Sequence, residues 1–463
     1  MPSNASADVT AALSEHVASA SYHALPDAAI QAAKTFILDS FGVALSGTRV
    51  PAMQVLHEIA ATWGKGDAAR VWGTGEAYPA ASAAFLNGYQ IHNQEWDCLH
   101  EPAVVHPMAV VLATLIAWAE SVSRTRRVSG CELILGCTVA IDVAATLGSA
   151  AQNRLQFFRP AMCGALGATA GLATMHGLDA RTTRSAMGSC YSQLSGTMQA
   201  HVEGSPVLPL QIGFNTRAAL NAIELAARGI LGPLNWLEGP FGYFTLIDPQ
   251  WDKQPFTDLR LGQCVTELSH KPFPSGRASH GGADGVIELQ RRHRFLSKNV
   301  AAVRIFAPPL VRQLVDRPPS ADMAPSYARL CLPYVAATAL LRGTVTVEDF
   351  EPAAIAQPSR QALAIRIRVC ADANASHKAL VPQRVEVDLT NGSQHAIDLP
   401  AVLGAPGRPL SRIQHLEKFS AAAQSGARAM SREQIDQLVE VVQQLEACDD
   451  VVQLVDRLMF VPA

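Results

Sequence analysis

The densest group of ionisable side chains in the first half of the chain lies in the segment 87–107, NGYQIHNQEWDCLHEPAVVHP. Three histidines and three carboxylates fall within fifteen of its residues, and an apolar stretch follows directly. A loop over a hydrophobic core can hold a histidine as a general base beside carboxylates that orient it. The segment therefore predicts a site for proton transfer.

The same residues also have a purely structural interpretation. Asp97 and Glu101 could cap helices, while His92 and His100 could be exposed to solvent. Metal binding is a third possibility, but the spacing of the histidines and Asp97 matches no compact ligand motif. We therefore expect no metal site.

A second polar cluster, SHKPFPSGRASHGG at 269–282, supplies cations. Lys271, Arg277 and His280 suit a substrate that carries carboxylates, because arginine binds a carboxylate through two parallel hydrogen bonds and lysine acts as a point charge. The segment lies where the composition of the chain changes, and clefts between domains are favoured ligand sites. The alternative is that these residues are ordinary surface charges.

Three further segments each combine a turn with the start of a helix, where backbone N–H groups can meet an anion. They are FFRPAMCGALGA at 157–168, GTMQAHVEG at 196–204 and GFNTRAA at 213–219. The motifs of nucleotide-binding proteins and serine hydrolases are absent: the sequence has no Gly-x-Gly-x-x-Gly after a strand, no Gly-x-x-x-x-Gly-Lys and no Gly-x-Ser-x-Gly.

The elements that must position these groups are helical over the first half of the chain. From about residue 7 to 230, apolar residues recur at three- and four-residue steps, and short Gly, Pro or Asn segments separate the runs. In the run 27–43, we expect Asp27 to be the N-cap and Asp39 to be a surface or capping group. Small residues further on predict a bundle with close helix crossings: Gly164, Gly167 and Gly171.

After about residue 265, apolar and polar residues alternate in four short runs. The predicted strands are 300–306, 364–369, 384–389 and 395–399, with Asn391-Gly392 as a hairpin turn and a helix at 326–341. Helices return after 404–409, at 411–423, 431–445 and 449–459. The predicted fold is mainly α, with a helical domain (1–265 and 404–463) and an inserted α+β lid domain (266–403).

Composition excludes several classes of function. Of the 463 residues, 49% are hydrophobic and 17% charged, which indicates extensive burial, and the net charge of −3 without a basic run argues against nucleic acid as a partner. The apolar stretch 104–119 is too short to span a membrane, and residues 1–17 do not resemble a secretory signal. We expect a cytoplasmic protein whose nine scattered cysteines are reduced.

Taken in order, the segments resemble the MmgE/PrpD family along nearly the whole chain. The resemblance is carried by ILDSFGVALSG at 37–47, the 87–107 segment, RPAMCGALGATAGLA at 159–173, GFNTRAALNAIELAARGILGP at 213–233, LEGPFGYF at 237–244, KPFPSGRASH at 271–280, LPYVAATALLRG at 332–343 and GAPGRPLSRIQHLEKF at 404–419. The family's architecture, a helical domain from both chain ends plus an α+β lid, agrees with the predicted layout. The resemblance also implies a homodimer with an interdomain site.

Family members, which include 2-methylcitrate dehydratases, cis-aconitate decarboxylases and iminodisuccinate epimerase, remove a proton from a carbon next to a carboxylate. The resemblance implies no cofactor. Its acidic and His-Pro site element falls on Glu95, Asp97 and His106, its Lys-x-x-Pro-Ser element on Lys271, and its downstream histidine on His280.

Several polar positions depart from the family's pattern. Arg159-Pro160-Ala161 stands where the dehydratases and decarboxylases carry His-Pro-Thr, and Leu208 stands in place of a lysine. Gln211 stands in place of a histidine, and Gly276 stands where the decarboxylases have a histidine. Arginine binds carboxylates but is not a base near neutral pH. We therefore expect Arg159 and Arg277 to bind substrate carboxylates, with His201 and Glu203 compensating for the lost lysine.

Three functions follow from the resemblance. The first is a lyase for a small di- or tricarboxylic acid, in which His106 is the acid/base group, Glu95 or Asp97 orients it, and the cations hold carboxylates. The second is a cofactor-free epimerase or isomerase, because the same proton removal without a leaving group inverts the carbon. The third is a degenerate, carboxylate-binding dimer.

Overall fold

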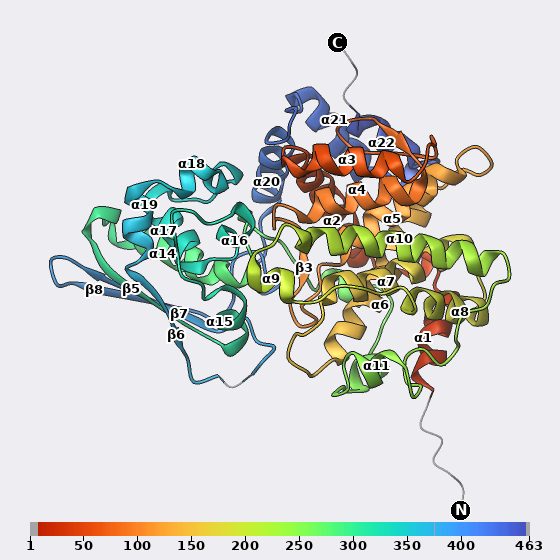
Figure 1. Ribbon diagram of the computed structural model, residues 1–463, viewed down its shortest axis with the longest axis horizontal. Helices are drawn as coiled ribbons and strands as arrows, with labels where there is room; N and C mark the ends of the chain where they lie inside the picture. Colours follow the sequence, from red (N-terminus) through yellow and green to blue (C-terminus); the bar gives the residue numbers. More distant parts are fainter. Residues whose placement is uncertain (1–7, 375, 460–463) are drawn as a thin grey trace, which may run out of the picture.

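Two groups of elements, each with its own hydrophobic core, make up the computed structural model, which describes residues 8–374 and 376–459 (Figure 1). The larger group, here the helical unit, contains elements from both ends of the chain. The smaller, here the sheet unit, is built mainly from residues 273–399 around a four-stranded sheet. The prediction of a mainly α fold is confirmed, while the domain boundaries at 265 and 404 stay predictions.

The helical unit follows the chain through the elements α1 (Val9–Ser19), η1 (Tyr22–Ala24, a 3₁₀ helix), α2 (Asp27–Gly47), α3 (Ala52–Thr62), β1 (Ala69–Arg70), β2 (Ala77–Tyr78), α4 (Ala80–His92), β3 (Leu99–His100), α5 (Pro107–Val122), α6 (Gly130–Ala150), α7 (Arg159–His176), α8 (Ala180–Tyr191), α9 (Gln199–Glu203), α10 (Val207–Ala227), α11 (Tyr243–Leu246), α12 (Gln254–Thr257), α13 (Gln263–Thr266), β4 (Leu268–Ser269), α20 (Arg412–Gln424), α21 (Arg432–Gln443), η5 (Leu445–Ala447) and α22 (Val452–Leu458).

Helices α6 and α7 pack closely in the centre of the helical unit (Figure 1). A Cβ atom at Gly167 or Gly171 would collide with the backbone carbonyl of the facing turn of α6, so only glycine allows this approach. The C-terminal helices α20 and α21 pack on α2, and α22 contacts α5. Ser431 and Gln434 form a capping box at the start of α21.

The sheet unit contains η2 (Arg277–Ser279), α14 (His280–His293), η3 (Ser297–Asn299), β5 (Val300–Ala307), α15 (Pro309–Val315), α16 (Pro325–Ala328), α17 (Leu332–Arg342), η4 (Val347–Phe350), α18 (Pro352–Ile355), α19 (Pro358–Ala364), β6 (Ile367–Ala371), β7 (Gln383–Leu389) and β8 (Gln394–Leu399). The strand order is β6-β5-β7-β8, with β6 parallel to β5 and the other pairs antiparallel. Helix α14 covers one face of the sheet over buried Ile305 and Val385, with α17 against it.

Four local predictions are corrected by the structure. Asp27 is the first residue of α2, and Pro26 is its N-cap. The helix predicted at 326–341 is split, because Pro333 fits only in the first turn of α17. The strand predicted at 364–369 begins at Ile367, after α19 ends. Asp39 is buried rather than at the surface.

Two helices, α2 and α6, are long and apolar enough to cross a membrane by length and composition alone. Within their most apolar windows, 72% and 89% of the residues are buried inside the protein, as in core helices. Burial against other helices therefore accounts for their apolar character.

Candidate active site

A short antiparallel ladder brings together the two polar clusters that the sequence singles out. Strand β3 pairs with β4 so that Leu99 faces Ser269. The residues just before β3 and just after β4 thus become neighbours, although about 170 positions separate them. His106 is the N-cap of α5, and Pro107 occupies the first turn, where its missing N–H leaves no bond unmade.

The segment between α4 and α5 has a strained backbone. Glu95 has a φ of 52° and Val104 a φ of 54°, in the left-handed region that residues with a side chain rarely adopt. Val104 is β-branched, which makes this conformation more costly still. Strain of this kind costs about 1–3 kcal/mol per residue and persists only where surrounding contacts enforce it, which is often at a functional site.

Asp97 contacts two imidazoles through one carboxylate oxygen. His92 Nδ1 donates a hydrogen bond to Asp97 Oδ2 at 2.9 Å, and His106 Nδ1 lies 3.3 Å from the same oxygen. A carboxylate only accepts, so it favours the tautomer of His106 that carries its proton on Nδ1 and leaves Nε2 free as a base. Asp97 and His92 are buried, contrary to the expectation of a solvated histidine.

Lys271 lies on the other side of the same carboxylates. Its Nζ donates to Glu95 Oε2 at 2.9 Å and to the Glu95 carbonyl at 3.1 Å, and it is 3.7 Å from Asp97 Oδ1. The lysine side chain is fully buried. A buried ion pair needs such additional hydrogen bonds to offset the loss of hydration.

These contacts set the charge of each group. Burial alone would raise the pKa of both carboxyl groups, but the neighbouring cations dominate: the pKa of Glu95 falls to about 2, and that of Asp97 is held well below its usual value. Burial opposes protonation of His92, yet the charges of Asp97 and Glu95 raise its pKa. Burial and Lys271 together lower the pKa of His106. His106 is therefore a neutral imidazole beside an ionised carboxylate.

A cavity opens in front of these groups, between the helical unit and the sheet unit. Its volume is about 60 Å³, measured as the space open to the centre of a water molecule. Its walls include His92, Glu95 and His106 from the α4–α5 segment, Pro160 and His201 from the helical unit, and Gly276, Arg277 and Leu330. A neutral base, ionised carboxylates and buried cations around one cavity can move a proton and stabilise the negative charge that develops.

Arg277 lines this cavity and His280 is buried nearby, but both side chains already have partners within the protein. Arg277 donates to Glu101 at 2.8 and 2.9 Å and to the carbonyl of Leu403 at 2.7 Å, so its guanidinium joins three segments. His280 starts α14, and its Nε2 lies 3.1 Å from the carbonyl of Ser275. It is not part of the cavity wall.

Arg159 does not reach the cavity. Its guanidinium is buried, donates to Asp248 at 2.9 Å and to the Asn153 carbonyl at 3.0 Å, and is absent from the cavity wall. Asp248 also accepts a hydrogen bond from Tyr243 at 3.0 Å. The carboxylate that Arg159 binds in this structure thus belongs to the protein itself, which argues against its predicted role in substrate binding.

His201 lines the cavity, but not as the cation that would compensate for a lost lysine. Burial and Arg317 lower its pKa to about 4, so it is neutral at physiological pH. Arg317 Nη2 donates to His201 Nδ1 at 3.0 Å, which leaves the imidazole proton on Nε2. Glu203, the other residue considered for this role, is exposed and pairs with Gln199.

Two arginines near the site were missed by the sequence reasoning. Arg317 follows α15 and Arg329 caps the end of α16, and both are buried close to the charge of Glu95. Neither lies in a polar cluster of the sequence. The available signal was that Arg329 lies three residues before the segment 332–343, which resembles the family.

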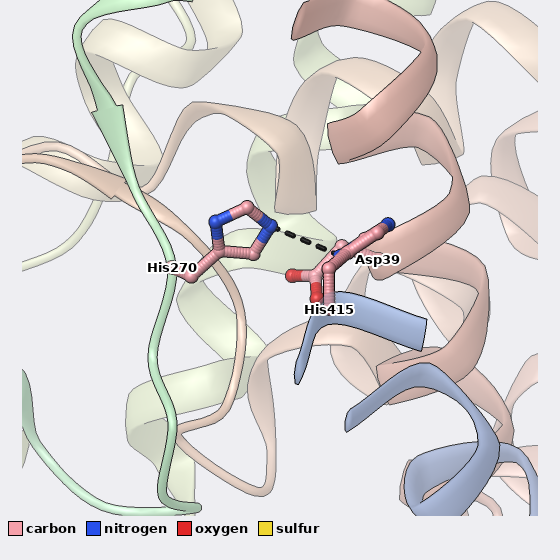
Figure 2. A group of neighbouring side chains, drawn as sticks. All are labelled: Asp39, His270 and His415. Carbon is pink, nitrogen blue, oxygen red and sulfur yellow. Dashed lines mark hydrogen bonds between the residues drawn. The ribbon is translucent and has the colours of Figure 1, made fainter. Parts of the chain in front are cut away.

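Among the described residues, three groups of side chains are close enough to hold a metal ion by distance alone: His92, Asp97 and His106; Asp39, His270 and His415; and His100, Cys264 and Glu267. In the first, the ammonium of Lys271 is already 3.7 Å from Asp97. In the second, shown in Figure 2, His270 hydrogen bonds to His415 at 3.1 Å, and Lys418 lies 2.6 Å from Asp39. In these first two groups, the lysine ammonium beside the carboxylate disfavours the binding of a metal cation.

The second group also supports the active site. Lys418 Nζ, which lies 2.6 Å from Asp39 Oδ1, also donates to Asp39 Oδ2 at 2.9 Å and to the carbonyl of Trp96 at 3.0 Å. Trp96 stands between Glu95 and Asp97, and His270 directly precedes Lys271. Helices α2 and α20 thereby fix both segments that carry the ionised groups.

Comparison with known proteins identifies the family of this chain. Residues 11–255 match the model of the MmgE/PrpD N-terminal domain, and residues 273–444 match that of the MmgE/PrpD C-terminal domain. Cis-aconitate decarboxylase of Homo sapiens is 26% identical over 442 residues, covering 92% of this chain and 89% of that protein. The Mus musculus enzyme is 26% identical over 444 residues, with 92% and 88% covered. Cis-aconitate decarboxylase of Aspergillus terreus is 30% identical over 304 residues, with 63% and 62% covered. Because the two family models together match more than half of the chain, this protein belongs to the MmgE/PrpD family.

Proposed function

We propose that this protein is a lyase of the dehydratase or decarboxylase type that acts on a small di- or tricarboxylic acid without a cofactor. The observation that carries the proposal is the neutral His106 imidazole, oriented by ionised Asp97 in the wall of a cavity lined by buried charges. The relatives named cis-aconitate decarboxylases support the same class of reaction.

In the proposed reaction, His106 Nε2 exchanges a proton with the carbon next to a substrate carboxylate. In a dehydration it removes that proton, the electron pair forms the carbon–carbon double bond, and the hydroxyl group leaves as water after protonation. In a decarboxylation the C–C bond to a carboxylate breaks, carbon dioxide leaves, and the electron pair of that bond takes up a proton from His106, which has first gained it from solvent. Asp97 stabilises the imidazolium in either case.

An epimerase or isomerase is the second candidate. The observation that favours it is a second neutral imidazole in the cavity wall, that of His201, because inversion needs a group that returns the proton. A degenerate dimer that binds carboxylates without turnover is the third candidate, and no particular contact favours it.

Incubation of the chelator-treated protein with a panel of di- and tricarboxylic acids in deuterated water separates these functions. A lyase gives a new alkene or releases carbon dioxide, whereas an epimerase exchanges deuterium into an acid of unchanged constitution. Activity that disappears on chelation and returns with one specific metal would contradict the cofactor-independent mechanism. Binding without turnover or exchange of any acid in the panel would favour the degenerate dimer.

A further inference from the structure

Five arginines are buried among the described residues, and they fall into two classes. Three have a carboxylate partner within 4.0 Å: Arg159 with Asp248, Arg277 with Glu101, and Arg360 with Asp349. Arg317 and Arg329 have no such partner among the residues that the structure describes. A buried charge without a counter-charge is costly, so these two side chains require an explanation.

Arg329 lines a second chamber beside the main cavity. The wall between the two consists of His92, Glu95 and Leu330, which line both. Arg329 donates to Gln94 Oε1 and lies over the ring of Phe350 at 5.0 Å, while its Nε has no partner. Leu208, which stands where the family's pattern has a lysine, lines the same chamber. The guanidinium thus supplies a cation to a chamber from which that lysine is missing.

Arg317 approaches the site from α15. Its Nη2 donates to the ring and the carbonyl of His201, a residue of the main cavity wall, and its Nη1 is buried without a partner. The guanidinium also lies over the ring of Tyr327 at 5.1 Å. Arg317 is absent from the walls of both the main cavity and the second chamber, so its contact with the site is indirect, through His201.

The carboxylates nearest to the second chamber already have a cationic partner. Lys271 lies 2.9 Å from Glu95 and 3.7 Å from Asp97, whereas among the described residues no carboxylate lies within 4.0 Å of Arg329. A substrate carboxylate would supply this missing partner, because a guanidinium binds a carboxylate through paired N–H donors.

We propose that Arg329 binds one carboxylate of the substrate in the second chamber while the rest of the molecule occupies the adjoining main cavity, and so selects a dicarboxylate or larger acid. This inference rests on the proposed function, because it assigns specificity to the same site. It transfers the carboxylate-binding role from Arg159 and Arg277, whose guanidinium groups are committed to Asp248 and Glu101.

The test is calorimetric binding of tricarballylate, an inert tricarboxylate, to the full chain and to four variants. Arg329→Gln should weaken binding about ten- to a hundredfold, the contribution of a hydrogen bond to a charged group, and Arg317→Gln, whose side chain lines neither chamber, should weaken it less. Arg312→Gln, which removes an exposed charge from α15, should leave the affinity unchanged. Arg360→Gln, which breaks a buried ion pair, should lower the Tm and leave the affinity unchanged.

The Tm of the ligand-free protein distinguishes a role of Arg329 in substrate binding from a role in stability. Arg329→Gln should keep or raise the Tm, because it removes an uncompensated charge. Unchanged affinity in Arg329→Gln would overturn the proposal. A wild-type protein that does not bind tricarballylate, or an Arg329→Gln variant with the Tm loss of Arg360→Gln, would also overturn it.

The proposed function is tested separately through turnover. If the protein converts a carboxylic acid through His106 while the affinity for tricarballylate does not depend on Arg329, this inference fails and the proposed function stands. If the affinity depends on Arg329 but no acid is converted, the inference stands and the proposed function fails.

Discussion

Lys271 Nζ contacts the carboxylate of Glu95 at 2.9 Å and its backbone carbonyl at 3.1 Å, and so connects the segment after β4 to the segment after α4. The lysine side chain is fully buried and Glu95 is nearly so. The pair therefore stabilises the closed arrangement of two segments that are remote in the sequence, and its loss should affect stability and catalysis differently.

Lys271→Met should lower the free energy of unfolding by about 3–5 kcal/mol, because it leaves a buried carboxylate without its counter-charge. The double variant Lys271→Met with Glu95→Met should recover much of this loss, since both charges are then absent. Urea unfolding measures the stability of both proteins. Turnover should stay low in the double variant, and a Lys271→Met variant as stable as the wild type would contradict the structural role of the pair.

His106→Ala should lower turnover by about two to four orders of magnitude, the usual contribution of a general acid/base. Substrate binding should change much less, because the imidazole is neutral in the free protein. His176→Ala, at the exposed end of α7, is the matched control and should keep full activity. If His106→Ala instead unfolds while each folded molecule retains its activity, His106 is a structural residue.

For a dehydration, the pH dependence of kcat/KM should have an acid limb below pH 6.5. In that reaction His106 must be unprotonated to accept a proton, and burial and Lys271 lower its pKa from 6.5, so activity is present above that lowered pKa and is lost as the pH falls through it. Lys271→Met removes a positive charge that opposes protonation, and should move the limb to higher pH. Asp97→Asn removes the negative charge that favours protonation, and should move it to lower pH. Limbs that do not move, or move in the opposite directions, would exclude His106 as the titrating base.

Much of this architecture follows from local patterns in the sequence. The helix positions, the mixed α and β character after residue 265 and the capping box at Ser431 depend on periodicity and short-range hydrogen bonds, which neighbouring residues determine. Two predictions were wrong for different reasons. The helix predicted at 326–341 is split because Pro333 fits only in the first turn of a helix. Asp39 was predicted at the surface but pairs with Lys418, a residue distant in the sequence, in the interior.

The site was predictable only in part, because its pairings are long-range. His106, Asp97, Glu95 and Lys271 do come together, whereas Arg159 belongs to a separate ion pair with Asp248. Nothing in the 157–168 segment indicates that partner, which lies 89 positions away. The left-handed backbone of Glu95 has no signal in the sequence either, since no glycine stands there.

The protein should form a homodimer through the helical unit. Helices α3 and α10 both pack on α4, and each presents large apolar side chains to solvent, among them Ile59, Trp63 and Phe214, the last with 44% of its surface exposed. Phe85 contacts both Trp63 and Phe214, at ring distances of 5.0 and 5.3 Å, so the three rings form one patch. Exposed patches of this kind mark interaction surfaces.

Sedimentation at micromolar concentration should therefore give a dimer, and Phe214→Glu should give a folded monomer, because the carboxylate would be buried without a partner in the interface. Leu246→Glu, at an exposed position on α11, is the control and should remain dimeric. A wild-type monomer would contradict the homodimer, and a dimeric Phe214→Glu would exclude this patch as the interface.

The protein should be poor at decarboxylating cis-aconitate and at dehydrating 2-methylcitrate. By the family's pattern, those activities use a histidine and a lysine at the positions of Arg159 and Leu208. Losing an ammonium that stabilises developing charge in a partly desolvated cleft should cost about a thousandfold in rate. Arg159 cannot offset the loss, because its guanidinium is paired with Asp248. Arg329 supplies a charge beside Leu208, but as a planar group from the sheet unit, which favours a differently placed carboxylate.

The comparison is kcat/KM on both acids, measured beside the human relative of 26% identity on cis-aconitate and a dehydratase with the family's histidine and lysine on 2-methylcitrate. Leu208→Lys should not restore the activity, because the new ammonium would lie in the chamber of Arg329 and meet an uncompensated like charge. Leu208→Met, of similar volume and no charge, controls for packing and should behave like the wild type. A kcat/KM comparable to that of either relative would contradict this prediction. A large gain in kcat/KM in Leu208→Lys, but not in Leu208→Met, would also contradict it, because a cation at position 208 would then act on the substrate as in the family's pattern.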